Sequence, residues 1–281
     1  MRNDRHSHTS GLIGIFDSGY GGLTIFDKIE QAMPEYDYVY LGDNARAPYG
    51  TRSFEVVYRF TRQAVCRLFE EGCQLVILAC NTASAKALRT IQQKDLPLLD
   101  PTRRVLGVIR PTVEAIDSIS RTKHVGVLGT SGTISSLSYS IEIEKMFPFM
   151  TVTGEACPMW VPLVENNEFD SPGADYFIQR HIEHILAVDP SIDTLILGCT
   201  HYPLLICKIR RFLPGGVALF SQGERVAQSL RDYLTRHPEM DSRLGKQATR
   251  RFLTTESAAK FSEAASLFLS RPIEVEHITI S

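Results

Sequence analysis

Leu75-Val76-Ile77-Leu78-Ala79-Cys80-Asn81-Thr82 occurs a second time in the chain, with small changes, as Thr194-Leu195-Ile196-Leu197-Gly198-Cys199-Thr200-His201. Each segment is a short apolar run followed by a cysteine and polar residues. An unbroken apolar run of this length indicates a strand buried on both faces, as in a parallel sheet. A cysteine at the carboxyl end of such a strand lies where open α/β sheets bind their ligands. The two segments therefore predict two halves that each present one thiol to a shared cleft.

The residues before Cys80 predict alternating strands and helices. Strands are expected at 11–16 and 38–41, and helices at 22–33 and 53–71, each with apolar residues on one face. This β-α-β-α-β order is typical of a doubly wound parallel sheet.

The pattern starts again in the second half of the chain. A weak strand is expected at 105–109, and a glycine-containing strand at 125–129 matches the one that contains Gly14. We predict an α/β protein of two pseudo-symmetric, doubly wound parallel-sheet domains, with the active site in the cleft between them. The expected units are a disordered extension (1–10), a first half (11–104), a second half (105–211) and a C-terminal segment packing back on the first half (212–281).

Composition excludes several classes of protein. The 281 residues are 43% hydrophobic and 22% charged, with a net charge of −2. No basic field indicates binding to nucleic acid or to an anionic membrane surface, and no apolar run is long enough to cross a membrane. The first ten residues are polar, which does not fit a secretory signal. The six cysteines lack disulfide spacing, which favours a reduced, cytoplasmic setting.

Several side chains near the two segments have alternative roles. Asp17 and Ser18 follow a strand directly, where they could contact a substrate or orient a thiol, or cap the next helix. His201 could be a structural histidine or could modulate the Cys199 thiol. Glu165 could be a solvated loop acid or a cleft residue, and the sequence alone favours the first.

Other sequence patterns are weak. The glycines after Asp17 do not form a dinucleotide-binding loop, because Thr24 stands where the last glycine is required. No cluster has zinc-ligand spacing, so no metal is expected. Cys66, Cys73 and Cys207 are expected to be structural. Cys157, before Pro158, could lie near the cleft, but nothing around it in the sequence indicates a base.

With these motifs together, the chain resembles the glutamate racemases of bacteria, within the cofactor-independent aspartate/glutamate racemase superfamily. The residues that carry the resemblance are Gly14-Ile15-Phe16-Asp17-Ser18-Gly19-Tyr20-Gly21-Gly22-Leu23, Gly42-Asp43-Asn44-Ala45-Arg46 with Pro48-Tyr49-Gly50, Cys80-Asn81-Thr82-Ala83, Gly129-Thr130 through Thr133, Pro162-Leu163-Val164-Glu165, and Gly198-Cys199-Thr200-His201-Tyr202-Pro203-Leu204.

The resemblance implies racemisation of L-glutamate to D-glutamate for peptidoglycan synthesis, without a cofactor, in the cytoplasm. It implies that Cys80 and Cys199 are the acid/base residues and that Asp17 and His201 tune them. The residues it implies around the substrate are Asp17, Ser18, Pro48, Tyr49, Gly50, Asn81, Thr82, Thr130, Thr133, Glu165, Thr200 and His201. We also expect a homodimer.

One segment departs from the family pattern. Ser221-Gln222-Gly223-Glu224 stands where many members have Asp-Ser-Gly-Glu. We expect this change to alter the interface between the halves or the packing of subunits, and not the chemistry.

Racemisation explains why two thiols would be needed. One base cannot reach both faces of the α-carbon unless the substrate turns over, whereas two opposed acid/base groups can. The helix N-termini expected after Cys80 and Cys199 would stabilise the negative charge that develops on the substrate.

Other functions compete with this hypothesis. The substrate could be aspartate or a hydantoin. A thiol hydrolase using Cys199 and His201 is disfavoured, because their two-residue spacing makes the pairing awkward and Cys80 stays unexplained. A non-catalytic amino-acid binding module would need no paired thiols.

Overall fold

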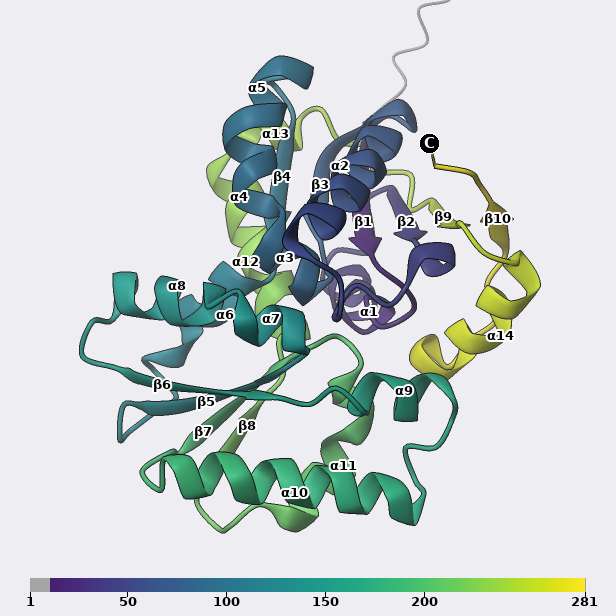
Figure 1. Ribbon diagram of the computed structural model, residues 1–281. Coiled ribbons are helices and arrows are strands. Elements are labelled where there is room, and N and C mark those ends of the chain that lie inside the picture. The colour runs from purple at the N-terminus through teal and green to yellow at the C-terminus, as the bar shows by residue number, and fades with distance from the viewer. Residues whose placement is uncertain (1–10, 281) are drawn as a thin grey trace, which may run out of the picture.

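The computed structural model describes residues 11–280 and contains two parallel sheets, one above the other in Figure 1. The expected disorder of residues 1–10 lies outside the described residues. Every strand pairing within the two sheets is parallel, as the unbroken apolar runs predict.

The first sheet has six strands in the order β10-β9-β2-β1-β3-β4. They are β1 (Leu12–Asp17), β2 (Tyr38–Gly42), β3 (Cys73–Leu78), β4 (Arg104–Gly107), β9 (Arg250–Thr254) and β10 (Val275–His277).

The second sheet has four strands in the order β6-β5-β7-β8. They are β5 (His124–Gly129), β6 (Thr151–Ala156), β7 (Thr194–Gly198) and β8 (Ala218–Phe220). This order repeats β2-β1-β3-β4, with β3 equivalent to β7. The prediction of two pseudo-symmetric doubly wound halves is confirmed, and β9 and β10 extend the first sheet.

Helices cover both faces of each sheet (Figure 1). Those of the first part of the chain are α1 (Leu23–Ala32), α2 (Phe54–Glu70), α3 (Asn81–Lys86), α4 (Leu88–Thr90) and α5 (Leu96–Leu99), with the short turns η1 (Asn44–Arg46) and η2 (Ile91–Asp95). The others are α6 (Ile109–Ile116), α7 (Ser131–Ser135), α8 (Ser138–Met146), α9 (Trp160–Glu165), α10 (Pro172–Val188), α11 (Ile206–Phe212), α12 (Gly223–Arg236), α13 (Pro238–Asp241) and α14 (Ala258–Leu269), with η3 at Tyr202–Leu205.

Each sheet separates two apolar cores, because successive side chains of a strand point to opposite faces. In β1, Ile13 and Ile15 join the core under α1, α12 and α14, whereas Phe16 joins the core under α2 and α3. In β7, Leu195 and Leu197 pack under α10, whereas Ile196 packs under α6 and α8. The four cores hold the carboxyl ends of β3 and β7 in place.

Two strands lie in a different half from the one expected. β4 pairs with β3 in the first sheet, although residues from 105 onward were assigned to the second half. β8 pairs with β7 in the second sheet, although residues from 212 onward were expected on the first half. The short strands β4 and β8 form the edges of the two sheets, so that the buried strands β3 and β7 are paired on both sides. α12, β9, α14 and β10 do pack on the first half.

Among residues 11–280, no helix is both long enough and apolar enough to cross a membrane.

Candidate active site

A small cleft between the two sheets receives both thiols predicted from the sequence. Its volume is about 140 Å³, and Cys80 and Cys199 line it while being 5% and 6% exposed. The other lining residues are Ser18, Ala47, Pro48, Tyr49, Gly50, Thr51, Asn81, Thr82, Thr130, Ser131, Pro158, Val161, Pro162, Glu165, Thr200 and His201. This volume is below the roughly 300–1,000 Å³ of sites for drug-sized ligands. The cleft therefore suits a small metabolite.

The Cys80 sulfur lies at the N-terminus of a helix. Cys80 is the N-cap of α3, and its sulfur accepts the N–H of Ala83 at 3.5 Å and donates to Oγ of Ser18 at 3.5 Å. Burial raises the pKa of the thiol from 9.0 to about 12, and the nearby Asp17 carboxylate adds to the shift. The Ser18 hydroxyl and the Ala83 N–H oppose that rise, because both can donate a hydrogen bond to the thiolate. The neutral thiol is thus the stable form of Cys80.

Asp17 lies behind the cleft and does not line it. Its side chain is fully buried, and its carboxylate accepts the N–H of Gly19 at 3.0 Å and the Thr200 hydroxyl at 3.4 Å. Burial raises the pKa of Asp17 above its ordinary value. The helix-cap alternative is wrong, because α1 begins at Leu23 and its N-cap is Gly22.

The Cys199 sulfur has a histidine beside it. Nδ1 of His201 lies 3.9 Å from Sγ of Cys199, and Nε2 of His201 lies 3.0 Å from Oε1 of Glu165. Burial opposes a charge on His201, but its hydrogen bonds to Cys199 and Glu165 raise its pKa from 6.5 to about 10. The imidazolium is therefore the stable form, and it places a positive charge beside the Cys199 sulfur.

Of the two alternatives for Glu165, the cleft residue holds. Glu165 is the last residue of α9, it lines the cleft, and its carboxylate contacts His201 although the residue stays exposed. One expectation about this side is wrong. The two-residue spacing does not prevent a contact between Cys199 and His201, because the backbone turns directly after β7 and brings the imidazole back to the sulfur.

The chain after Cys199 also differs from the expected helix. Tyr202–Leu205 forms a short 3₁₀ helix, and α11 begins only at Ile206. Pro203 lies in the first turn of this 3₁₀ segment, where its missing N–H is not needed. Cys199 therefore does not cap an α-helix as Cys80 does.

Contacts between the halves close the cleft. The Gly132 N–H donates to the Gly50 carbonyl at 2.7 Å, and the Thr82 and Thr130 hydroxyls are 2.9 Å apart. Tyr49 is 1% exposed and its hydroxyl donates to the Asp43 carboxylate, which fixes the loop that carries Gly50. These contacts place Pro48, Tyr49 and Gly50 of the first half over residues of the second.

Most residues named from the sequence meet in this cleft, and a few do not. Thr133 is buried behind the wall, and its hydroxyl lies 3.1 Å from the Thr130 hydroxyl and 3.3 Å from the Thr82 hydroxyl. Cys66, Cys73, Cys157 and Cys207 do not line the cleft.

The sequence argument missed part of the wall. Ser131 stands within the hydroxyl-rich strand exit that includes Thr130, and this signal could have identified it. Pro158 and Val161 belong to an apolar segment that carries no chemical pattern. The full set of missed lining residues is Ala47, Thr51, Ser131, Pro158, Val161 and Pro162.

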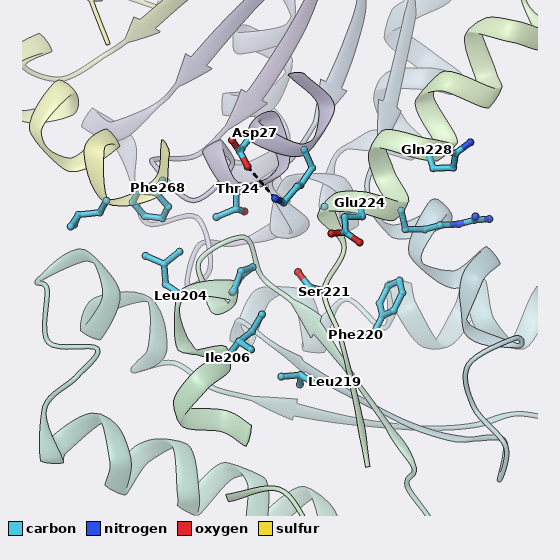
Figure 2. Close-up of a pocket in the computed structure, with 15 residues that line it drawn as sticks. Thr24, Asp27, Leu204, Ile206, Leu219, Phe220, Ser221, Glu224, Gln228 and Phe268 are labelled. Atoms are coloured by element: carbon cyan, nitrogen blue, oxygen red, sulfur yellow. Dashed lines mark ion pairs between the residues drawn. The ribbon is translucent and has the colours of Figure 1, made fainter. Parts of the chain in front are cut away.

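A larger hollow of about 920 Å³ opens on the surface (Figure 2) and contains neither thiol. It lies between α1, the segment after His201, the start of α12 and the end of α14. Figure 2 shows Thr24 and Asp27 of α1 facing Ser221 and Glu224 across it.

The fold and the thiol cleft define a class: a two-domain α/β protein whose two sheets each deliver one cysteine to a single small-molecule site. The same architecture occurs in solved structures. A glutamate racemase isoform from Bacillus anthracis has a TM-score of 0.87 and 34% identity, over 96% of this chain and 97% of its own. A glutamate racemase from Francisella tularensis in complex with D-glutamate has a TM-score of 0.85 and 29% identity, over 96% and 98%.

Sequence comparisons agree with the structural ones. The glutamate racemase of Dinoroseobacter shibae is 42% identical over 272 residues, which are 93% of this chain and 97% of that protein. Residues 13–228 match the family model described as Asp/Glu/Hydantoin racemase. The chain belongs to this family, and it is an isomerase that acts on amino acids.

Proposed function

We propose that this protein interconverts L-glutamate and D-glutamate by proton transfer between the substrate and two thiols, Cys80 and Cys199. The observation that carries the proposal is that two cysteines from separate sheets line one cleft of about 140 Å³. The glutamate racemases among the relatives support the choice of substrate.

This reaction needs two cysteine side chains in different protonation states, one thiolate and one neutral thiol. In one direction a thiolate removes the α-hydrogen from one face, and the thiol on the other side donates its proton to the opposite face. In this proposal Cys199, beside the His201 imidazolium, supplies the thiolate, and Cys80, whose pKa is raised by burial and by Asp17, supplies the neutral thiol. The roles reverse for the other enantiomer, and the protonation of the two sulfurs is exchanged after each turnover.

The cleft supplies donors for the charge that develops on the substrate. Removing the α-hydrogen puts negative charge on the α-carbon and its carboxylate. The start of α3 offers backbone N–H groups, and the side chains of Asn81, Thr82 and Thr200 add polar groups to the same wall. The low exposure of both cysteines keeps water from weakening these contacts.

The remaining residues would act around this centre. Ser18, Tyr49, Gly50, Pro48, Thr130 and Glu165 would shape and close the substrate site, and Asp17 and Thr133 would support it from behind. D-glutamate made in this way would supply peptidoglycan synthesis in the cytoplasm, and the enzyme would act as a homodimer.

A thiol hydrolase is the second candidate, because Cys199, His201 and Glu165 form a connected chain of hydrogen bonds. Such an enzyme would form an acyl intermediate on Cys199 and would have no use for Cys80. Burst kinetics with activated esters, together with the mass of the protein after quenching, would detect that intermediate.

The direct test is incubation of the purified protein with L-glutamate and no added cofactor, followed by chiral chromatography. The proposal predicts conversion to an equal mixture of enantiomers. Aspartate and a hydantoin in parallel reactions decide the substrate class. Retention of pure L-glutamate would refute the proposal.

A further inference from the structure

Gln222 is a buried polar side chain that the proposed proton transfer does not use. It is 2% exposed and lies between β8 and α12. Its neighbours Ser221 and Glu224 line the surface hollow shown in Figure 2, but the Gln222 side chain is hydrogen-bonded inside the protein. Burying an amide in this way is costly unless its donors and acceptor are all satisfied.

Gln222 completes a closed ring of hydrogen bonds with two residues from other elements. The Tyr139 hydroxyl donates to Oδ1 of Asn81, Nδ2 of Asn81 donates to Oε1 of Gln222, and Nε2 of Gln222 donates to the Tyr139 hydroxyl, each at 2.7 Å. All three bonds run in the same direction around the ring, which strengthens each of them. Burial raises the pKa of Tyr139, so its hydroxyl keeps the proton that it donates.

The second hydrogen of Nε2 anchors the ring to α6. It donates to the Thr112 hydroxyl at 2.7 Å, and that hydroxyl donates to the Val108 carbonyl at 2.7 Å. Asn81, Tyr139 and Thr112 are all 3% exposed or less. The whole network is therefore shielded from water.

The ring connects the two strand ends that carry the thiols. Asn81 follows Cys80 directly, is the first residue of α3 and lines the cleft. The Tyr139 ring packs close to Gly198, the residue before Cys199. A Cβ atom added to Gly198 would lie 3.4 Å from Cε2 of Tyr139. A shift of Gln222 would be transmitted to both sides of the cleft.

We propose that Gln222 is a positioning residue, which holds the Asn81 amide and the Tyr139 ring so that the Cys80 and Cys199 strand ends keep their mutual placement. Asn81 donates one N–H to Gln222 and accepts the Tyr139 hydroxyl at Oδ1, and these two bonds fix its amide at the wall of the cleft. This inference rests on the proposed racemisation, because the placement of the two cysteines matters only if protons pass between them and the substrate.

Glutamine has the groups that this place requires. It supplies one acceptor and two donors at one position, so that Asn81, Tyr139 and Thr112 are all satisfied. A glutamate would offer acceptors only, and the Tyr139 hydroxyl would turn toward it and leave Oδ1 of Asn81 unbonded. A methionine would fill the space and make none of the bonds.

The test compares Gln222→Met and Gln222→Glu with Gln228→Met, a control within α12 whose exposed amide donates to Asp232. Both Gln222 variants should lower kcat by roughly 10- to 100-fold, since small displacements of catalytic groups have effects of that size. Gln228→Met should keep kcat within about twofold of the wild type, as expected for an exposed residue. Assays are run well below each unfolding temperature, so that a purely structural role would leave kcat unchanged.

A second variant covers the case that Gln222→Met does not fold. Tyr139→Phe removes one hydroxyl and keeps the ring that packs on Gly198, and it should lower kcat by a similar factor. The double variant Gln222→Glu/Tyr139→Phe should be little worse than either single variant, because the ring acts as a unit. Wild-type kcat in the Gln222 variants, or multiplicative effects in the double variant, would overturn the proposal.

A readout without substrate separates this inference from the proposed function. Iodoacetamide labelling of Cys80 and Cys199, mapped by mass spectrometry, should be several times faster in Gln222→Met than in Gln228→Met. Equal labelling rates would refute the role of Gln222, whereas a wild-type protein that racemises no amino acid would refute only the proposed function.

Discussion

Cys80 and Cys199 end equivalent strands, β3 and β7, but the groups around the two sulfurs differ. Cys80 caps an α-helix and has a hydroxyl and a buried carboxylate behind it. Cys199 precedes a 3₁₀ turn and has an imidazole beside it, held by Glu165. The backbone plan has been kept in both halves while the electrostatic surroundings have diverged. A pair of thiols in unlike surroundings can begin a reaction with one protonated and one ionised.

The largest expected effect on activity comes from removing either sulfur. Cys80→Ala and Cys199→Ala should each lower racemisation by on the order of 10³-fold, because each removes one of the two proton-transfer groups. Chiral chromatography measures the rate, and Cys207→Ala, at an exposed cysteine, is the matched control. Activity near the wild-type level in Cys199→Ala would refute a two-thiol mechanism.

Removing the imidazole should disturb the Cys199 side alone. His201→Gln should lower kcat by roughly 10- to 100-fold, because the thiolate loses the positive charge that stabilises it. The pH dependence of kcat should change as well. His184→Gln, on the surface of α10, serves as the control and should behave like the wild type. An unchanged pH profile in His201→Gln would contradict the assigned role.

The two sulfurs should respond in opposite directions to their neighbours. Asp17→Asn removes a negative charge that raises the pKa of Cys80, so Cys80 should react faster with iodoacetamide. His201→Gln should make Cys199 react more slowly. Each unit of pKa changes the thiolate fraction tenfold, so changes of up to about tenfold are expected. Mass spectrometry of the labelled peptides resolves the two sites, and equal changes at both would show that the surroundings are equivalent.

The smallest expected effect is on stability. The pKa of His201 is raised from 6.5 to about 10 in the folded protein. Its contribution is therefore complete below pH 6.5 and is lost as the pH rises toward 10, because the folded state there binds a proton that the unfolded state does not. The free energy of unfolding should therefore decline gradually across this pH window. Urea denaturation at several pH values measures it, and the free energy of unfolding of His201→Gln should decline less over this window.

The sequence predicted what depends on local pattern and missed what depends on distant partners. The apolar runs before Cys80 and Cys199 predicted buried parallel strands, and the matching glycines predicted two related halves. The sequence could not predict where the first half ends, because β4 is weakly apolar and its place is decided by pairing with β3. It also could not predict the contact between Glu165 and His201, because the two residues are 36 positions apart and meet only in the folded chain.

The departure at Ser221-Gln222-Gly223 shows the same limit. The prediction that it affects the interface between the halves agrees with the hydrogen bonds of Gln222 to Asn81 and Tyr139. Which residues it would meet could not be inferred, since Asn81, Thr112 and Tyr139 come from three separate helices. The apolar wall at Pro158 and Val161 likewise carries no pattern that distinguishes it from ordinary core.

The most direct test of the two-thiol account follows deuterium during the first few per cent of reaction in deuterated water. The reaction starts from L-glutamate. The two enantiomers are then separated, and the deuterium content of each is measured by mass spectrometry. Two opposed groups predict that the D-glutamate formed carries solvent deuterium at the α-carbon while the remaining L-glutamate carries none. D-glutamate that retains the original hydrogen, or equal labelling of both enantiomers, would mean that one group serves both faces and would contradict the account.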